Sequence, residues 1–317
     1  MSSLRDEARE LRDQLVSGSF VAGWSAVKGM PEPVARRLFQ RAADVAARRE
    51  GAGARQLREN LRRVAGPAVS EQRLDELTRD GLRSYARYWL ETFRLPAMDK
   101  RAVGASVERR TTGAEHIDAA LAAGRSFILA LPHMGNWDVA AVWLIDRHGK
   151  GFTTVAERLR PDSLFDRFVA YREGLGMEVL ALSGGDRPPL SVLTDRLKNG
   201  GNVCLVADRD LSQSGIDVEF FGEPATMPGG PAMLAALTGA ALLPVSLWFP
   251  AEGQWAQHIS PEIEIPGGRL ADRVRAGTRA LAAVFETQIR AHPTDWHMLQ
   301  PFWPADRRLR RPAAEVA

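Results

Sequence analysis

The sequence of 317 residues predicts an α/β fold in which helices flank a central, mainly parallel β-sheet, with a helical region before it. Five short runs are apolar almost throughout, which is typical of strands covered on both faces. Helix-length segments separate most of these runs, as the crossover connections of parallel strands require. The runs comprise residues 127–131, 152–155, 177–182, 203–207 and 242–249.

The first hundred residues show helical rather than strand periodicity. Apolar side chains recur there at the three- and four-residue spacing of amphipathic helices, and Ser70 stands where a helix N-cap is expected. We therefore expect residues 1–100 to form an amphipathic, basic helical region. Residues 101–305 form the α/β core and 306–317 a basic tail, all within one compact domain. The apolar stripes are Phe20, Val21, Trp24, Val27 and Met30, followed by Leu74, Leu77, Leu82, Tyr85 and Trp89.

Positive charge is concentrated between residues 36 and 63. Nine arginines and three carboxylates give this segment a net charge of +6, whereas the whole chain carries only +3. Two interpretations remain open at this stage: ordinary solvated helix faces, or a surface that attracts anionic lipid head groups or phosphates. No DNA- or RNA-binding module is present, so we expect no nucleic-acid partner.

The segment between Glu223 and Glu252 contains no charged residue and exceeds the roughly 20 residues of a membrane-spanning helix. Its many prolines and glycines would break such a helix and leave backbone groups unpaired in lipid. It therefore predicts a loop, a short helix from Pro231 to Thr238, and the strand at 242–249. The charged N-terminus does not resemble a secretory signal. The single Cys204 lies in an apolar run, which favours a reducing, cytoplasmic compartment.

Polar side chains follow three of the predicted strands. His133 and Asp138 come after the first run, Glu157 and Arg158 after the second, and an Asp208-Arg209-Asp210 triplet after the fourth. Ligands of parallel α/β sheets bind beyond the carboxyl ends of the strands. We therefore expect histidine, carboxylate and arginine side chains to converge at one edge of the sheet.

His133 is the candidate catalytic base, because it lies between an apolar run and the start of a predicted helix. The positive end of that helix favours the Asp138 carboxylate and disfavours an imidazolium. A neutral imidazole whose other nitrogen is held by a carboxylate is a general base. Asp138 and Asp208 are both candidate partners. The alternative is that Asp138 stabilises the first turn of the helix and His133 is an ordinary loop histidine.

Other chemistries lack their signatures. The chain has no Gly-x-Ser-x-Gly elbow, no P-loop Gly-Lys-Ser/Thr, and no complete dinucleotide-binding glycine motif. Asp208 and Asp210 have no second histidine at ligand spacing, so we expect no metal site and no cofactor. A candidate base without a protein nucleophile favours a reaction in which the base activates a substrate hydroxyl, and this hydroxyl attacks an already activated substrate. Acyl transfer from a thioester is a reaction of this kind.

The stretch His133-Met134-Gly135-Asn136-Trp137-Asp138 resembles the His-x4-Asp motif of the lysophospholipid and lipid A acyltransferase superfamily. The resemblance to this superfamily covers about residues 55–300. Within it, Glu157-Arg158-Leu159-Arg160-Pro161 and Asp208-Arg209-Asp210-Leu211 resemble the actinobacterial phosphatidylinositol mannoside acyltransferases. Further matching blocks follow in the family's order. They are Leu164-Phe165-Asp166, Arg172-Glu173-Gly174-Leu175-Gly176, Phe220-Phe221-Gly222, Ala225-Thr226, Gly230-Pro231-Ala232 and Leu243-Pro244-Val245.

This resemblance implies a lysophospholipid acyltransferase-like fold and a peripheral enzyme at the cytoplasmic face of the cell membrane, without a transmembrane helix. The implied reaction moves a long acyl chain, typically palmitoyl, from acyl-CoA to the 6-hydroxyl of a mannose of phosphatidylinositol mannosides. Its partners are acyl-CoA, the glycolipid acceptor and an anionic membrane surface. Another glycolipid or lysophospholipid acceptor, or a non-catalytic peripheral lipid-binding protein, stays open as an alternative.

The candidate catalytic residues are then His133, Asp138 and Asp208. The candidate substrate-binding residues are Glu157, Arg158, Arg172 and Arg209. A planar guanidinium matches phosphate geometry, so we expect Arg158 and Arg172 to contact phosphate, the alternative being surface ion pairs with Glu157 or Glu173. Backbone N–H groups near Gly230 are the candidate oxyanion site.

Overall fold

The computed structural model describes residues 23–158, 161–211 and 214–309. Its main sheet has seven strands in the order β1-β9-β8-β2-β5-β3-β4. All neighbouring pairs are parallel except β8 and β9, so the predicted mainly parallel sheet is confirmed. The five predicted strands are β2 (Phe127–Leu131), β3 (Thr153–Ala156), β4 (Glu178–Ala181), β5 (Val203–Val206) and β8 (Ala241–Trp248).

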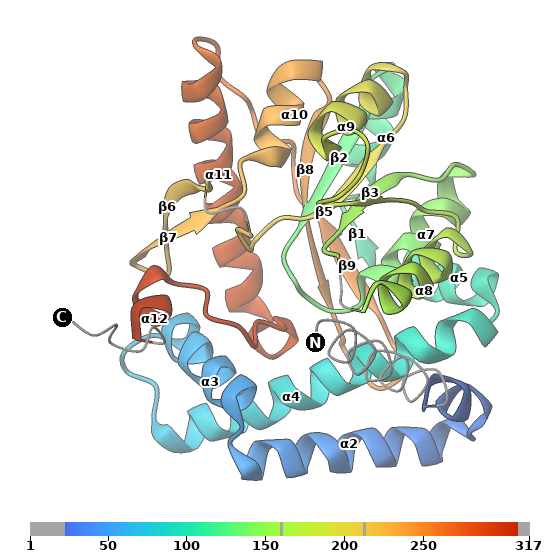
Figure 1. The fold of residues 1–317 in the computed structure, drawn as a ribbon, viewed down its shortest axis with the longest axis vertical. Coiled ribbons are helices and arrows are strands. Elements are labelled where there is room, and N and C mark those ends of the chain that lie inside the picture. Colours follow the sequence, from blue (N-terminus) through green and yellow to red (C-terminus); the bar gives the residue numbers. More distant parts are fainter. Residues whose placement is uncertain (1–22, 159–160, 212–213, 310–317) are drawn as a thin grey trace, which may run out of the picture.

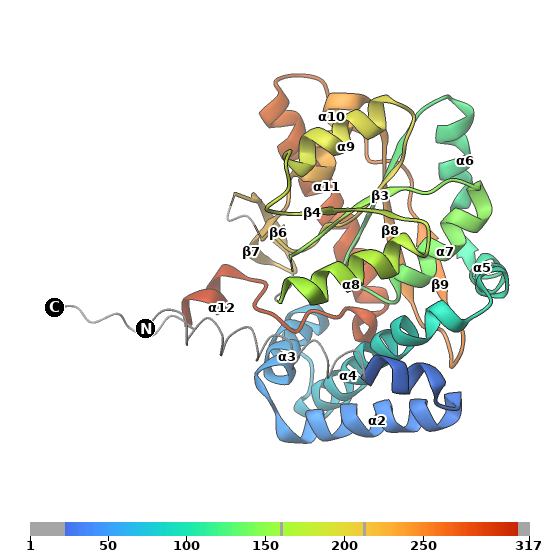
Figure 2. The ribbon, with the colours of Figure 1, turned by 45° about the vertical axis from the view of Figure 1, so that its right-hand side comes forward.

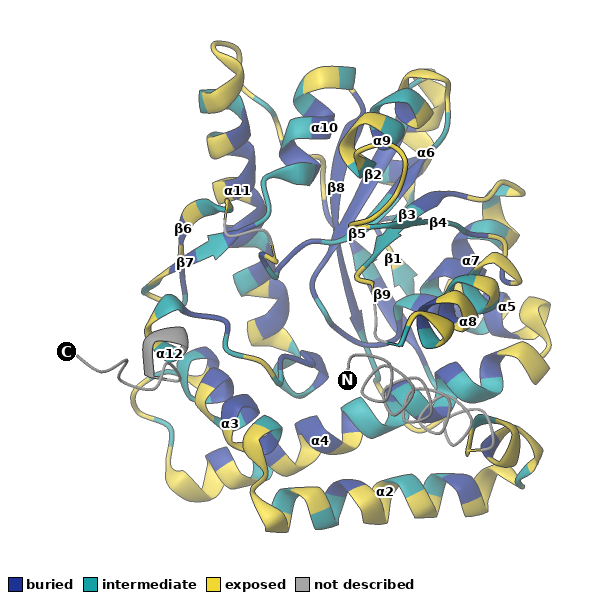
Figure 3. Ribbon diagram, in the orientation of Figure 1, coloured by how far each residue is buried: buried dark blue, intermediate teal, exposed yellow. Residues whose placement is uncertain are grey.

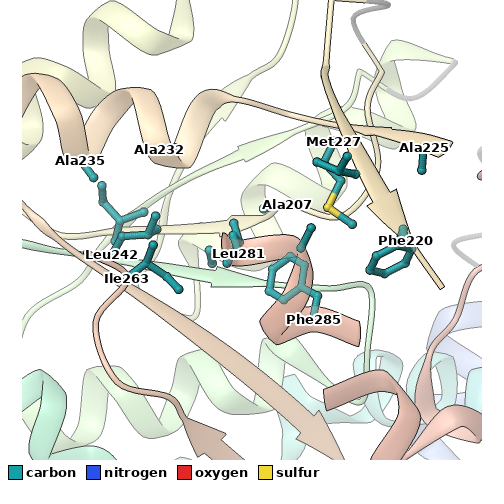
Figure 4. Packing of buried hydrophobic residues seen from close by; sticks show 14 of the residues in the cluster. Ala207, Phe220, Ala225, Met227, Ala232, Ala235, Leu242, Ile263, Leu281 and Phe285 are labelled. Carbon is teal, nitrogen blue, oxygen red and sulfur yellow. The ribbon is translucent and has the colours of Figure 1, made fainter. Parts of the chain in front are cut away.

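Both faces of the sheet are covered, which explains the continuous apolarity of the strands. Along β2, Phe127, Leu129 and Leu131 belong to one buried cluster, and Ile128 and Ala130 belong to another. The first cluster includes α5 (Lys100–Glu108), α6 (Ala114–Ala122) and α7 (Trp137–His148). The second includes α10 (Gly230–Thr238) and α11 (Leu270–Ala291), on the opposite side in Figure 1, and Figure 4 shows part of its packing.

Four further strands have no counterpart among the predictions. They are β1 (Thr111–Thr112), β9 (Ala256–Ile259), and an antiparallel hairpin of β6 (Ile216–Phe220) and β7 (Glu223–Met227). β6 alternates buried and exposed side chains, because only one of its faces packs on the core. A search for continuous apolar runs therefore misses it. The two-residue turn at Phe221 and Gly222 has positive φ at both positions, as a type I′ hairpin requires.

The predicted N-terminal helical region contains α2 (Glu32–Arg49), α3 (Ala52–Ala65) and α4 (Glu71–Arg94). Ser70 caps α4 by accepting a hydrogen bond from the backbone N–H of Arg73 at 3.2 Å. Leu57, Leu61 and Leu74 are fully buried where α3 and α4 meet. Figures 1 and 2 both show these helices together along one end of the sheet. The predicted stripe residues Phe20 and Val21 lie outside the described residues.

The remaining helices connect the strands and close the C-terminal end of the chain. Figure 3 shows both exposed and buried residues along α8 and α9. The last of them, α12, includes Asp306, which pairs with Arg63 of α3 at 2.8 Å, so the segment expected to be a basic tail begins as a docked helix. These elements are α8 (Asp162–Glu173), α9 (Pro189–Lys198), α12 (Pro304–Leu309) and the short 3₁₀ turns η1 (Leu95–Ala97) and η2 (Pro293–Asp295).

The uncharged segment before Glu252 contains the predicted helix and strand, as the nine-residue α10 and the buried β8, but its first part is strand β7 where a loop was expected. In the part of the chain that the structure describes, none of the helices combines the length and apolarity needed to cross a membrane.

Candidate active site

His133 and Asp208 meet at the carboxyl edge of the sheet. β2 and β5 are parallel neighbours with Leu131 opposite Val206, so the two residues lie at matching positions just beyond the strands. His133 Nδ1 lies 2.5 Å from Asp208 Oδ1, and the backbone N–H of His133 donates to Asp208 Oδ2 at 3.0 Å. The structure thus pairs His133 with the carboxylate from the neighbouring strand.

Asp208 is fully buried and accepts a third hydrogen bond, from Trp296 Nε1 to Oδ2 at 2.9 Å. Burial by itself would raise the pKa of the Asp208 carboxyl. The attraction and hydrogen bonds of His133 and the Trp296 bond outweigh burial and lower the pKa below its ordinary value of 3.8. An ionised carboxylate only accepts hydrogen bonds, so Nδ1 of His133 carries the hydrogen and Nε2 is left as the basic nitrogen.

Asp138 has a different partner. It lies in the first turn of α7, where the Asn136 side chain caps the helix by accepting from Val139 N–H at 3.1 Å. The Asp138 side chain is fully buried, and its Oδ1 accepts from Arg172 Nε of α8 at 3.0 Å. Burial disfavours the charge on Arg172, yet the Asp138 carboxylate keeps the pKa of the guanidinium above its ordinary value. Asp138 and Arg172 therefore form a buried ion pair beside the His133–Asp208 pair.

The other candidate binding residues lie at the ends of β3 and β5. Glu157 Oε2 and Arg209 Nη2 approach to 3.4 Å. Arg158 Nε pairs with Asp162 at 3.3 Å, and its guanidinium lies over the Phe165 ring. Arg158 therefore pairs with Asp162 and Arg172 with Asp138, and the ion pairs with Glu157 or Glu173 considered from the sequence are not among the contacts of the described residues. Glu157 contacts Arg209 instead.

One cavity of about 580 Å³ joins most of these groups. Its lining includes His133, Asp138, Glu157, Arg172 and Arg209, together with many apolar side chains from both sides of the strand ends. Arg158 is not part of this lining, although the Phe165 ring beneath its guanidinium is.

Gly230 at the N-terminus of α10 and Cys204 of β5 also line the cavity. Burial raises the pKa of the Cys204 thiol well above its ordinary value, so Cys204 stays a neutral thiol. The cavity therefore combines the His133 imidazole and several charged side chains with mainly apolar walls.

Sequence reasoning missed the segment that runs beside His133 from the far end of the chain. The backbone N–H of Gly135 donates to the carbonyl of Asp295 at 2.9 Å, and that of His297 donates to the carbonyl of His133 at 2.7 Å. An isolated antiparallel bridge joins Met134 and Trp296 between them. More than 150 residues separate Met134 from Trp296, so no local spacing in the sequence indicates that they touch. The only feature of the later segment that could have drawn attention is its Asp-Trp-His triplet at residues 295–297.

Ser84 of α4 joins two side chains of that segment. Its hydroxyl donates to Asp295 Oδ1 at 2.6 Å and lies 2.8 Å from His297 Nε2. Burial raises the pKa of Asp295 to about 6, and burial together with the nearby His133 lowers the pKa of His297 to about 3. His297 is thus neutral, and this buried polar group ties the N-terminal helices to the site.

Comparisons with known proteins show the family of this chain. The sequence profile of the bacterial lipid A biosynthesis acyltransferases matches residues 7–304. A phosphatidylinositol mannoside acyltransferase of Mycobacterium tuberculosis (strain CDC 1551 / Oshkosh) is 52% identical over 91% of this chain and 88% of its own length.

Two further relatives point the same way. The protein of that name from Mycolicibacterium smegmatis is 50% identical over 93% of this chain and 94% of its own length. A lipid A biosynthesis acyltransferase of Haemophilus influenzae is 26% identical over 58% of this chain and 55% of its own length. The chain therefore belongs to the bacterial lipid A biosynthesis acyltransferase family, and the resemblance to phosphatidylinositol mannoside acyltransferases expected from its motifs is confirmed.

Proposed function

We propose that this acyltransferase moves a long acyl chain, palmitoyl, from acyl-CoA to the 6-hydroxyl of a mannose of phosphatidylinositol mannosides, at the cytoplasmic face of the cell membrane. The observation that carries the chemistry is the His133–Asp208 pair in the wall of a large, mainly apolar cavity. The acceptor class comes from the names of relatives that share half of the sequence. Family membership favours an enzyme over the non-catalytic lipid-binding protein considered from the sequence.

In the proposed reaction, His133 Nε2 takes the proton of the sugar hydroxyl as its oxygen attacks the thioester carbonyl carbon. The C–S bond of the tetrahedral intermediate then breaks, and the imidazolium returns the proton to the thiolate, which leaves as coenzyme A. Asp208 stabilises the imidazolium between the two steps. General-base assistance of this kind contributes about 10²- to 10⁴-fold to the rate.

The remaining candidate residues bind the substrates. The apolar part of the cavity holds the acyl chain. Glu157, Arg158, Arg172 and Arg209 bind the phosphate and sugar groups, because guanidinium donors match phosphate oxygens and a carboxylate accepts from sugar hydroxyls. Backbone N–H groups at the N-terminus of α10, near Gly230, face the developing oxyanion with the positive end of the helix dipole.

Mass spectrometry of lipids incubated with the enzyme and palmitoyl-CoA tests this function. We expect phosphatidylinositol mannosides to gain one palmitoyl group, with one coenzyme A thiol released for each group transferred. Fragmentation places the new ester on a mannose. Transfer only to lysophospholipids or to another glycolipid would contradict the acceptor, and acyl-CoA binding without thiol release would contradict the reaction.

The surface of α2 supports membrane association. Val34 and Leu38 are each 52% exposed, and Arg37 and Arg41 are exposed beside them at helical spacing. Within the described residues, neither arginine has a carboxylate partner, whereas Arg58, Arg62 and Arg63 of α3 are paired with carboxylates. An exposed helix face that mixes apolar and unpaired basic side chains is typical of peripheral membrane binding. The membrane surface proposed here is therefore α2, a narrower region than residues 36–63.

Charge reversal on α2 is expected to weaken binding to anionic vesicles. Arg37→Glu/Arg41→Glu should shift the protein from the vesicle pellet to the supernatant at low salt. The wild type should be released as salt rises, because salt screens exposed charges that lie farther apart than the Debye length, about 8 Å at physiological ionic strength. The matched control is Arg269→Glu/Arg275→Glu at the start of α11, which makes the same charge change at exposed positions elsewhere and also removes two ion pairs with Asp272. Equal losses in both variants would show that net charge, and not α2, decides binding.

A further inference from the structure

Trp296 contributes its indole N–H to the carboxylate that holds the catalytic base. We infer that Trp296 is a positioning residue that fixes the orientation of Asp208, and through it that of His133, for the transfer reaction; this inference rests on the proposed function. Trp296 follows η2, 163 positions after His133 in the sequence.

The two carboxylate oxygens of Asp208 have different hydrogen-bond donors. Oδ2 accepts from Trp296 Nε1 at 2.9 Å and from the His133 backbone N–H at 3.0 Å, and Oδ1 lies 2.5 Å from His133 Nδ1. Two donors that converge on Oδ2 prevent rotation of the carboxylate about its Cβ–Cγ bond. Oδ1 is therefore held where Nδ1–H donates to it, and Nε2 stays free of hydrogen and turned toward the substrate.

The indole itself is immobilised by its packing. Trp296 is fully buried, with ring centroids 5.6 Å from Phe302 and 6.2 Å from both Phe220 and Trp303. Such a core allows few alternative rotamers, so the indole N–H is directed at Asp208 before substrate arrives.

The backbone of Trp296 is also tied to the loop that carries the base. Trp296 forms a β-bridge with Met134, and hydrogen bonds on either side join Asp295 to Gly135 and His297 to His133. The indole N–H, Asp208 and His133 thus form one connected unit of hydrogen bonds. Without the indole N–H, Oδ2 keeps only the backbone donor of His133, so the buried carboxylate is less fully satisfied and held less firmly. Loss of the indole N–H is therefore expected to disorder the base and leave substrate affinity intact.

The experiment compares Trp296→Phe with the matched control Trp303→Phe. Trp303 is fully buried in the same core cluster, and its Nε1 also donates one hydrogen bond, to the carbonyl of Phe220 at 3.1 Å. Both substitutions remove the same atoms from the same core. We expect Trp296→Phe to lower kcat at least tenfold with KM for donor and acceptor within twofold of wild type. Trp303→Phe should keep kcat within twofold at a similar loss of melting temperature.

A double-mutant cycle shows whether Trp296 acts through Asp208. If it does, adding Trp296→Phe to Asp208→Asn should change kcat less than twofold, because the group that the indole positions is already impaired. Additive losses would overturn the inference. So would a Trp296→Phe enzyme with kcat within twofold of wild type, or equal losses of kcat in the two tryptophan variants.

A third measurement is independent of transfer activity. In protein labelled with ¹⁵N-histidine, the His133 Nδ1–H resonance, assigned by its loss in His133→Ala, should be strongly downfield in the wild type. It should shift or broaden in Trp296→Phe but not in Trp303→Phe. An unchanged resonance in Trp296→Phe would refute the positioning role even if the proposed acceptor proves wrong. If Phe unfolds the protein, 3-benzothienylalanine at position 296 keeps the indole shape without the N–H donor, and the same outcomes apply.

Discussion

Replacement of His133 by Ala is expected to lower the rate of acyl transfer about 10²- to 10⁴-fold, the contribution of a general base. The fold should survive, because Asp208 keeps two of its three hydrogen bonds, from Trp296 and from the backbone N–H of residue 133. Thiol release under single-turnover conditions measures the chemical step, and thermal melting measures stability.

His116→Ala on α6 is the control for the loss of an imidazole. His116 is partly exposed and lies outside the cavity lining, so its loss should leave turnover within twofold of wild type. A His133→Ala enzyme that keeps a third or more of wild-type activity would exclude His133 as the base.

Among the proposed substitutions, replacement of Asp138 by Asn is expected to lower the free energy of unfolding most. It leaves the buried Arg172 guanidinium without an ionised partner, and breaking a buried ion pair from one side costs about 3–5 kcal/mol. Activity should fall too, because α7 begins four residues after His133 and Arg172 lines the cavity. Urea unfolding measures the free energy of unfolding of the variant and the wild type.

Arg172→Met in the Asp138→Asn background shows whether the loss of stability comes from the broken ion pair or from a general packing defect. Removing both charges is often close to neutral in stability, so the double variant should recover most of the free energy of unfolding that the single variant loses. Activity should stay low, because Arg172 is also a proposed ligand of the substrates. An Asp138→Asn protein as stable as wild type would refute the argument from burial.

Asp208→Asn provides a further contrast with Asp138→Asn. Asn supplies a single acceptor oxygen where Asp208 receives three N–H donors, and its amide N–H₂ cannot accept a hydrogen bond. The expected consequence is a strong loss of turnover together with some loss of stability. The two carboxylates thus have different partners: Asp208 contacts His133, and Asp138 pairs with Arg172.

The parts of this protein that were predicted from sequence are those with a local signature. Continuous apolar runs predicted five strands of the main sheet, because a strand covered on both faces has apolar side chains at successive positions. The same reasoning identified Ser70 as a helix cap and placed His133 beyond β2. The hairpin of β6 and β7 escaped it, since its strands are covered on one face and alternate like any surface segment. The family followed from ordered motifs that span most of the chain.

Only the tertiary structure decided which carboxylate serves His133. Asp138 is five residues from His133 and Asp208 is 75, and the sequence left both open as partners. The register of β2 against β5 brings Asp208 within 2.5 Å of the imidazole, and α8 supplies Arg172 to Asp138 instead. Trp296 depends still more on the fold, because its segment reaches the site from the other end of the chain. The sequence by itself determined which strand ends carry reactive groups, whereas strand register and helix packing decided which of those groups touch.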